Sequence, residues 1–169
     1  MKILVLASRI PFPLEKGDKL RLYHQLKHLA PNHDITLCCL ADRPIDEAQA
    51  QALSPMVTAL HVLAISAPWR WLRMLGSWLS PLPFQVTWFT DGKAQDALKT
   101  ILKEVEPDVV FCQLVRGAEY IKDFHEVPKV LDYMDALSAG MHRRSHMAKG
   151  FLGQLKRWAM RTEGNRLAR

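Results

Sequence analysis

A short segment near the amino terminus, EKGDKLR (residues 15–21), combines residue types that bind anions. Gly17 allows a ligand to approach the backbone closely, and Lys16, Lys19 and Arg21 add positive charge. A helix that begins here would also offer free backbone N–H groups to an anion. The segment matches neither the G-x-G-x-x-G dinucleotide fingerprint nor the G-x-x-x-x-G-K-[ST] P-loop. Two interpretations stay open, a ligand loop or a tight turn whose basic residues face water.

Positive charge is concentrated at the carboxyl end of the chain. Residues 142–169 hold eight Lys or Arg against one Glu, a net charge of +7, whereas the rest of the chain carries −1. Such a segment can meet phosphates, acidic lipid headgroups or nucleic acid. It is equally typical of a solvated helix face.

Composition limits the class of protein. The 169 residues, 49% hydrophobic, fit one domain with a packed core. The sequence contains no run of about 18 apolar residues, so no membrane span is predicted. The apolar stretch in MKILVLASRI is too short for a signal peptide. Cys38, Cys39 and Cys112 lack the spacing of a metal or disulfide site, so we expect reduced, buried thiols in a cytosolic protein and no metal.

Strand and helix patterns alternate along the chain. Asp18 is the predicted N-cap of the first helix, and the second helix is expected to be capped near Pro44 or Asp46. The strands are predicted at residues 2–7, 34–41, 59–65, 108–114 and 129–134, and the helices at 18–30, 45–53, 68–80 and 91–105, followed by a long basic helix broken at Gly150 and Gly153.

This alternation predicts a Rossmann-like, three-layer α/β/α fold with a mainly parallel sheet between two layers of helices. Right-handed crossovers place all the loops that follow strands at one edge of the sheet, where ligands bind in open α/β folds. Residues 15–21 follow the first strand, so we expect them to lie over the site.

Several segments, taken in order, resemble the N-terminal domain of family 4-type glycosyltransferases with the GT-B fold. Those enzymes open with a strand, a proline-containing loop, a glycine loop and a helix, and PFPLEKGDKLR (11–21) takes the place of the glycine loop. The Lys-Gly-Asp-Lys variant is similar to a bacterial subgroup of sugar transferases associated with exopolysaccharide and PEP-CTERM surface-sorting systems. Later landmarks of that subgroup are matched by PLPFQVTWFTD (81–91), EPDVVFCQ (106–113) and KVLDYMDALSAGMHRRS (129–145).

A GT-B enzyme has two Rossmann-like domains, so the resemblance implies that residues 1–169 form one N-terminal, acceptor-side domain that ends before a C-terminal donor-binding domain. It implies transfer of a sugar from a nucleotide-sugar to a saccharide or lipid-linked acceptor in cell-surface or exopolysaccharide synthesis, without a cofactor or metal. The chain alone is expected to be inactive. Gly17, Asp18, Lys19 and Arg21 carry over as the loop that faces the donor phosphates and the acceptor.

One acidic residue is a candidate catalytic group under the same resemblance. Asp135 falls where the last predicted strand ends, a position from which it would hydrogen-bond a sugar hydroxyl. Asp135 is also a suitable N-cap for the next helix, and both interpretations remain open.

The segment PWRWLRMLGSWLS (68–80) is rich in tryptophan and arginine. Trp69, Trp71, Arg73 and Trp78 are typical of an interfacial helix or of a groove for a lipid-linked acceptor. The alternative is a helix whose tryptophans cover the sheet. Together with the basic carboxyl end, this segment predicts a cytoplasmic protein with peripheral contact to the anionic inner face of the cytoplasmic membrane.

A rival interpretation from another class is a non-enzymatic α/β binding module whose basic helix contacts nucleic acid or a partner chain. The sequence shows no helix-turn-helix and no aromatic RNA-binding signature, so nucleic acid is not an expected partner of the transferase.

Overall fold

The computed structural model describes residues 1–65, 71, 73–74, 76–77, 81–133, 137–147 and 151–168. Five strands form one sheet in the order β3-β2-β1-β4-β5, and each neighbouring pair is parallel. The strands are β1 (Lys2–Ala7), β2 (Asp34–Ala41), β3 (Ala59–Ala64), β4 (Val109–Gln113) and β5 (Lys129–Asp132).

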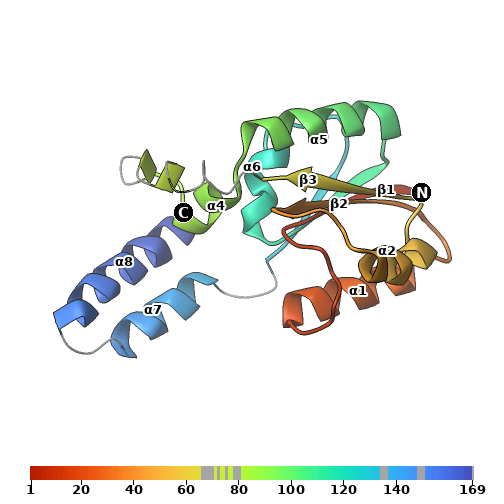
Figure 1. Cartoon of the computed structure of the whole chain (residues 1–169). Helices are drawn as coiled ribbons and strands as arrows, with labels where there is room; N and C mark the ends of the chain where they lie inside the picture. Colours follow the sequence, from red (N-terminus) through yellow and green to blue (C-terminus); the bar gives the residue numbers. More distant parts are fainter. Residues whose placement is uncertain are drawn as a thin grey trace.

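Helices cover both faces of this sheet (Figure 1). On one face lie α1 (Gly17–Leu29) and α2 (Glu47–Leu53), and on the other lie α5 (Gly92–Val105) and α6 (Ala118–Ile121). The predicted three-layer α/β/α fold with a parallel sheet is therefore confirmed. All five predicted strands are present, each within two residues of its expected bounds, because short apolar runs bounded by turn residues identify buried strands well.

The core is divided by the sheet into two clusters. Leu4 and Leu6 of β1 face α5, whereas Val5 and Ala7 face α1. The adjacent Cys38 and Cys39 on β2 likewise point to opposite clusters, as the alternation of side chains along a strand requires. Strands in the middle of a parallel sheet are buried on both faces, which is why their sequences are almost continuously apolar.

The helix ends show one wrong prediction. The N-cap of α1 is Lys16, which makes no side-chain capping bond, and Asp18 lies inside the first turn of the helix. Asp18 is instead engaged in tertiary contacts described below. Asp46 caps α2 in a capping box with Gln49, as expected, and Asp91 caps α5 by accepting from the N–H groups of the first turn.

The basic carboxyl end forms two helices, α7 (Leu137–Met147) and α8 (Phe151–Leu167). Gly150, where one break is predicted, lies outside the described residues. Gly153 lies within α8, so the break predicted there is wrong. The two helices form a hairpin that extends away from the α/β body (Figure 1). Gly164 lets them approach closely, because a Cβ there would lie 3.0 Å from His142 Nε2 and 3.2 Å from the carbonyl oxygen of Ser138.

Two short helices were not predicted. One is α4 (Phe84–Phe89), and the other is α6, which follows a 3₁₀ turn (Val115–Gly117) after β4. Both are too short to show a helical period in the sequence.

The cysteines yield a direct prediction. All three are buried, and burial raises the pKa of Cys38 and of Cys112 to about 12 and that of Cys39 well above its usual range. Because the thiolate is the reactive form, none of the three should react with a thiol reagent such as DTNB at pH 8 in the folded protein. All three should react in strong denaturant. Fast labelling of a thiol in the folded state would contradict this placement.

Candidate functional site

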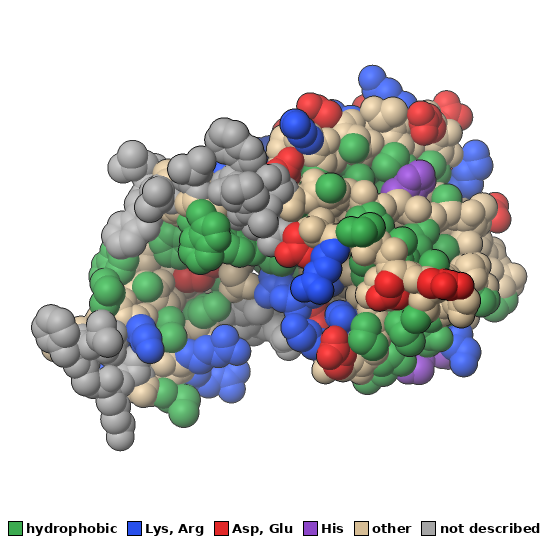
Figure 2. All heavy atoms as spheres, in the orientation of Figure 1, with side chains coloured by type: hydrophobic (Ala, Val, Ile, Leu, Met, Phe, Trp, Pro, Cys, Tyr) green, Lys and Arg blue, Asp and Glu red, His purple; other side chains and the backbone are tan. Residues whose placement is uncertain are grey.

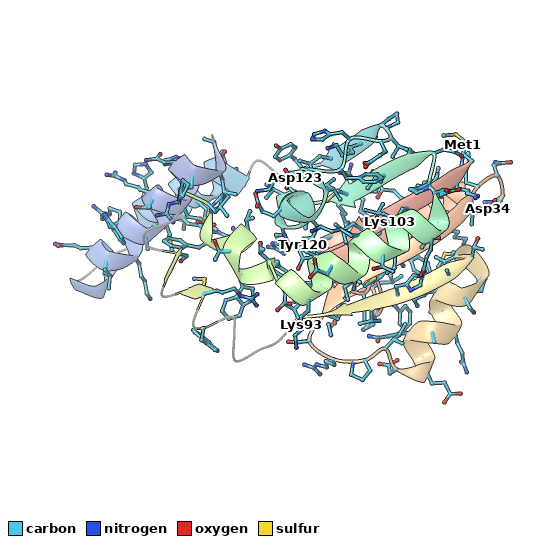
Figure 3. The ribbon with its side chains drawn as sticks, turned by 90° about the horizontal axis from the view of Figure 1, so that it is seen from above. Met1, Asp34, Lys93, Lys103, Tyr120 and Asp123 are labelled. Atoms are coloured by element: carbon cyan, nitrogen blue, oxygen red, sulfur yellow. The ribbon has the colours of Figure 1, made fainter. Side chains whose placement is uncertain are left out.

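The strand order reverses between β1 and β4, which defines the switch point of the sheet. In the sheet, β2 and β3 lie on one side of β1, and β4 and β5 lie on the other. Loops that leave neighbouring strands in opposite directions open a crevice at the carboxyl ends, and ligands bind there. In this chain the two loops are residues 8–16 and residues 114–117. Figure 3 shows Met1 and Asp34 at the amino end of the sheet and Tyr120 toward the opposite end.

The turn after β4 is tight. Leu114 has φ 69° and ψ 149°, a backbone conformation that residues with side chains seldom adopt. Its N–H donates to the carbonyl oxygen of Asp132 at 2.8 Å. At Gly117 a Cβ would come within 2.8 Å of a cysteine sulfur and 3.1 Å of a leucine methyl of the sheet. The strained residue and the glycine together bring Arg116 to the carboxyl edge.

Two arginines approach each other at this edge. Arg116 donates through Nε and Nη2 to Gln85 Oε1 at 3.2 and 2.9 Å, and its guanidinium lies 5.2 Å from the centroid of the Phe89 ring. Burial lowers the pKa of Arg116, the charge of Arg9 lowers it further, and Asp18 raises it. The carboxylate of Asp18, which pairs with Arg9, therefore only partly offsets the positive charge of the two arginines.

The first turn of α1 is fixed to both loops. Asp18 accepts from Arg9 Nη1 at 3.4 Å, and its carbonyl oxygen accepts from Gln113 Nε2 at 2.7 Å. Gly17 is not in the left-handed region, and a Cβ built on it meets no atom within 4 Å. No steric demand of the fold explains a glycine at this position, and the space in front of it is open.

The predicted loop residues diverge from this turn. Lys19 extends to Glu15, with Nζ 3.3 Å from Oε1. Arg21 extends in the other direction, with Nη2 3.0 Å from Asp132 Oδ2 at the end of β5. The predicted loop residues thus lie at one end of α1: Gly17, Asp18, Lys19 and Arg21. Lys19 and Arg21 nevertheless contact residues on opposite sides of the switch point.

A cavity of about 560 Å³ lies at the carboxyl ends of β1, β2 and β3. The loop after β1 and the start of α1 form one wall, the residues after β2 form a second, and Trp88 and Phe89 of α4 form a third. Its charged side chains come from the loops after β1 and β2 and from the ends of α1 and α2; they are Arg9, Glu15, Lys16, Lys19, Asp42, Arg43 and Asp46.

The cavity has a surplus of positive charge and one unpaired hydroxyl. Its three carboxylates are engaged, since Glu15 pairs with Lys19, Asp42 lies 3.9 Å from Arg43, and Asp46 caps α2. Within the described part of the chain, Lys16 has no carboxylate partner. The Ser8 hydroxyl is buried and makes no hydrogen bond to any described residue. Both groups are available to a polar, anionic ligand.

The aromatic wall is held in place at its carboxyl end by a tyrosine. The Tyr120 hydroxyl donates to the carbonyl oxygen of Phe89 at 2.6 Å and accepts from the N–H of Asp91 at 3.0 Å. This one side chain therefore fixes the junction between α4 and α5 against α6.

The amino end of α4 is held by the C-terminal hairpin. Glu163 of α8 is buried, and its carboxylate accepts from the first two N–H groups of α4 at 2.6 and 2.9 Å. Arg166 donates to the carbonyl oxygens of Ser77 and Leu82 at 3.1 Å each, and its guanidinium lies 4.6 Å from the centroid of the Phe84 ring. The hairpin thus positions the helix that carries Trp88 and Phe89.

The tryptophan-rich segment contacts the cavity wall where it is described. Trp71 is 68% exposed and packs edge-on against Trp88, with ring centroids 5.2 Å apart. Arg73 Nη2 donates to Asp91 Oδ2 at 3.0 Å, so its charge is engaged by the N-cap of α5. Trp69 and Trp78 lie outside the described residues. Contact of this segment with lipid stays a prediction.

The candidate catalytic residue Asp135 also lies outside the described residues, and both interpretations of it stay open. Sequence reasoning missed Arg9, Gln113, Arg116, Trp88 and Glu163. Arg9, Gln113 and Arg116 lie at or within three residues of the ends of predicted strands, which was a usable signal. No sequence signal marks Trp88 or Glu163, because their roles depend on contacts between distant segments.

Among the described residues, no three His, Cys, Asp or Glu side chains gather closely enough to hold a metal ion. None of the described helices combines the length and the apolar composition needed to cross a membrane.

Comparison with known proteins finds similarity only at the level of structure. No family model matches the sequence, and no curated protein matches it significantly. Solved structures that match include Phytolacca americana UGT2 bound to UDP-2-fluoro-glucose and pterostilbene, at 13% identity and TM-score 0.48, covering 87% of this chain. Another is a Polygonum tinctorium UDP-glucosyltransferase that glucosylates indoxyl, at 12% identity and TM-score 0.48, covering 86%. The chain spans about one third of the length of each. Similarity this distant assigns neither activity nor substrate.

The contact between Glu163 and α4 can be tested by mutation. Glu163→Ala leaves two N–H groups of α4 without their acceptor in a buried place, so we expect a loss of about 1–3 kcal/mol in the free energy of unfolding. Urea denaturation measures it. The matched control is Glu104→Ala on the exposed side of α5, which should change stability by less than about 0.5 kcal/mol. Equal effects of the two substitutions would contradict the structural role of Glu163.

Proposed function

We propose that this chain is the acceptor-side domain of a GT-B glycosyltransferase of the family 4 type. It works with a donor-binding domain to transfer a sugar from a nucleotide-sugar to a saccharide or lipid-linked acceptor, in cell-surface or exopolysaccharide synthesis. The chain alone does not catalyse transfer, because the donor site belongs to the other domain. The proposed location is the cytoplasm, with peripheral contact to the membrane.

The observation that carries this proposal is the cavity at the carboxyl edge of the sheet. Its volume of about 560 Å³ is within the range of small-molecule sites, and its walls combine polar groups with aromatic rings. The rings of Trp88 and Phe89 offer an apolar surface to the face of a sugar. Ser8 and Lys16 offer hydrogen bonds and charge to its hydroxyl or acidic groups.

The neighbouring arginines suit the departing group of the reaction. A nucleotide diphosphate develops negative charge as the bond to the sugar breaks, and positive groups already held in place stabilise that charge without rearrangement. Arg9 and Arg116 supply two guanidinium groups at the switch point, and the start of α1 adds N–H groups. Gly17 leaves open space through which phosphates reach that helix end. No metal is required in this scheme.

The loop residues carried over from the family keep their proposed roles in this geometry. Lys19 lines the cavity and acts on the acceptor side, whereas Arg21 acts on the β5 side with Asp132. Asp135 remains the proposed hydrogen-bond partner of a sugar hydroxyl.

A binding experiment on the chain itself tests the cavity. We expect calorimetric titration with a panel of mono- and disaccharides, sugar phosphates and nucleotide sugars to identify at least one saccharide that binds. Trp88→Ala should then raise its Kd roughly tenfold, since the variant loses about 1–2 kcal/mol of apolar contact. The control is Trp158→Ala on α8, outside the cavity, which should leave Kd within about twofold.

Melting curves separate a binding defect from unfolding in these variants. The proposal fails if no saccharide binds the folded protein, or if Trp88→Ala and Trp158→Ala weaken binding equally.

Substitutions at the start of α1 test the loop in a polypeptide that also carries a donor domain. Gly17→Val should abolish transfer and leave the melting temperature nearly unchanged, because the new side chain occupies open space and its backbone is not left-handed. Arg21→Ala should strongly lower the activity of protein that still folds. Because it removes the partner of the mostly buried Asp132 carboxylate, we expect a cost of about 1–3 kcal/mol in the free energy of unfolding. Lys27→Ala, exposed on the same helix, is the control. Full activity in folded Gly17→Val and Arg21→Ala would show that the loop is only a turn.

A further inference from the structure

Near the free end of the α7–α8 hairpin, the described side chains of α8 are exposed on every side of the helix. Residues 154–158, five successive positions of α8, are all exposed, and five successive positions cover the whole circumference of a helix. Met147 at the end of α7 is 78% exposed, and Leu155 is 61% exposed. This end extends away from the α/β body (Figure 1).

The exposed charge of the hairpin is entirely positive. Glu163 is the single acidic residue between positions 136 and 169, and it is buried against α4. The hairpin therefore presents Arg143, Arg144, Lys156 and Arg161 to solvent with no exposed carboxylate of its own. Figure 2 shows basic and hydrophobic side chains side by side on this part of the molecule.

We propose that this end of the hairpin, with Met147, Leu155 and Trp158 among basic residues, docks on an anionic lipid surface. The apolar side chains would enter the boundary between headgroups and acyl chains, while lysine and arginine would lie at the level of the phosphates. Trp158 is an amphipathic ring of the kind found at that depth. The inference deepens the membrane contact of the proposed function by naming its surface, and that surface is separate from the sugar cavity.

The same features favour lipid over nucleic acid. Basic side chains alone would serve either partner, because both present phosphates. Contact with a hydrated phosphate backbone would not bury the apolar surface of exposed residues such as Met147 and Leu155. Insertion at the boundary of the acyl chains would remove that surface from water, which lowers the free energy. The contact also differs from the predicted one at residues 68–80, where Trp71 packs on Trp88 and Arg73 is engaged by Asp91.

Vesicle co-sedimentation of the full chain provides the test. We expect binding to phosphatidylcholine vesicles that contain about one third phosphatidylglycerol, and little binding to phosphatidylcholine alone. Raising the salt from 0.05 to about 0.5 M should release most of the protein, because the Debye length falls well below 10 Å. On binding, Trp158 should move to a less polar environment, so the shift of tryptophan emission to shorter wavelength should be smaller in Trp158→Phe.

Matched variants locate the contact. Each basic residue near an anionic surface contributes roughly a factor of five in partitioning, so the double variant Lys156→Ala/Arg161→Ala should bind roughly 25-fold more weakly. Leu155→Ser should weaken binding with the charge unchanged. The control Lys27→Ala/Lys103→Ala removes the same charge from exposed positions on α1 and α5 and should change binding less than about threefold.

Several outcomes would overturn the inference. They are the absence of binding to either vesicle, equal binding to neutral and anionic vesicles, an equal loss in the Lys27/Lys103 control, and tight binding of single-stranded RNA in place of vesicles. Since the variants lie outside the cavity, saccharide titration of the same proteins reports on the proposed transferase separately. Lipid binding without sugar binding would preserve this inference and reject that function.

Discussion

The parallel register of the sheet is the constraint on which the rest of the structure depends. Because all five strands run in the same direction, every loop that follows a strand emerges at one edge, and both faces must be covered by helices. The reversal between β1 and β4 then places the Arg9 loop beside the Arg116 turn. The core that this arrangement requires explains the apolar strands, the buried thiols and the division of the interior into two clusters.

A second level of organisation is the short helix α4. A helix of six residues has little stability of its own, so its position depends on its partners. Glu163 holds one end, Tyr120 holds the other, and Gln85 joins it to Arg116. The aromatic wall of the cavity and the arginine pair are therefore connected, through a single element, to the C-terminal hairpin. A change in the position of the hairpin would alter the shape of the cavity.

The distribution of acidic groups explains how a modest net charge produces strongly positive surfaces. Several carboxylates are engaged in structural contacts: Asp91 and Asp46 cap helices, Asp18 and Asp132 pair with arginines, and Glu163 caps α4. The hairpin loses its only acid in this way. The cavity edge retains Lys16 and an arginine pair whose mutual repulsion is only partly offset. The hairpin is thus positive from its sequence alone, with eight basic residues against one acid in residues 142–169, whereas the positive cavity edge arises from the folding of the chain.

The sequence by itself determined the layers, the five strands and their common carboxyl edge, because buried strands and amphipathic helices have periods that one chain displays locally. It also placed the loop at residues 15–21 over that edge. Only the tertiary structure decided what the edge contains. The cap predicted at Asp18 was wrong because a bond from Arg9, nine residues away, engages its carboxylate, while Gln113 donates to its carbonyl oxygen. The role of Glu163, and through α4 the position of Trp88, became recognisable only when residues 78 and 79 positions apart came into contact, and no local pattern records such a contact.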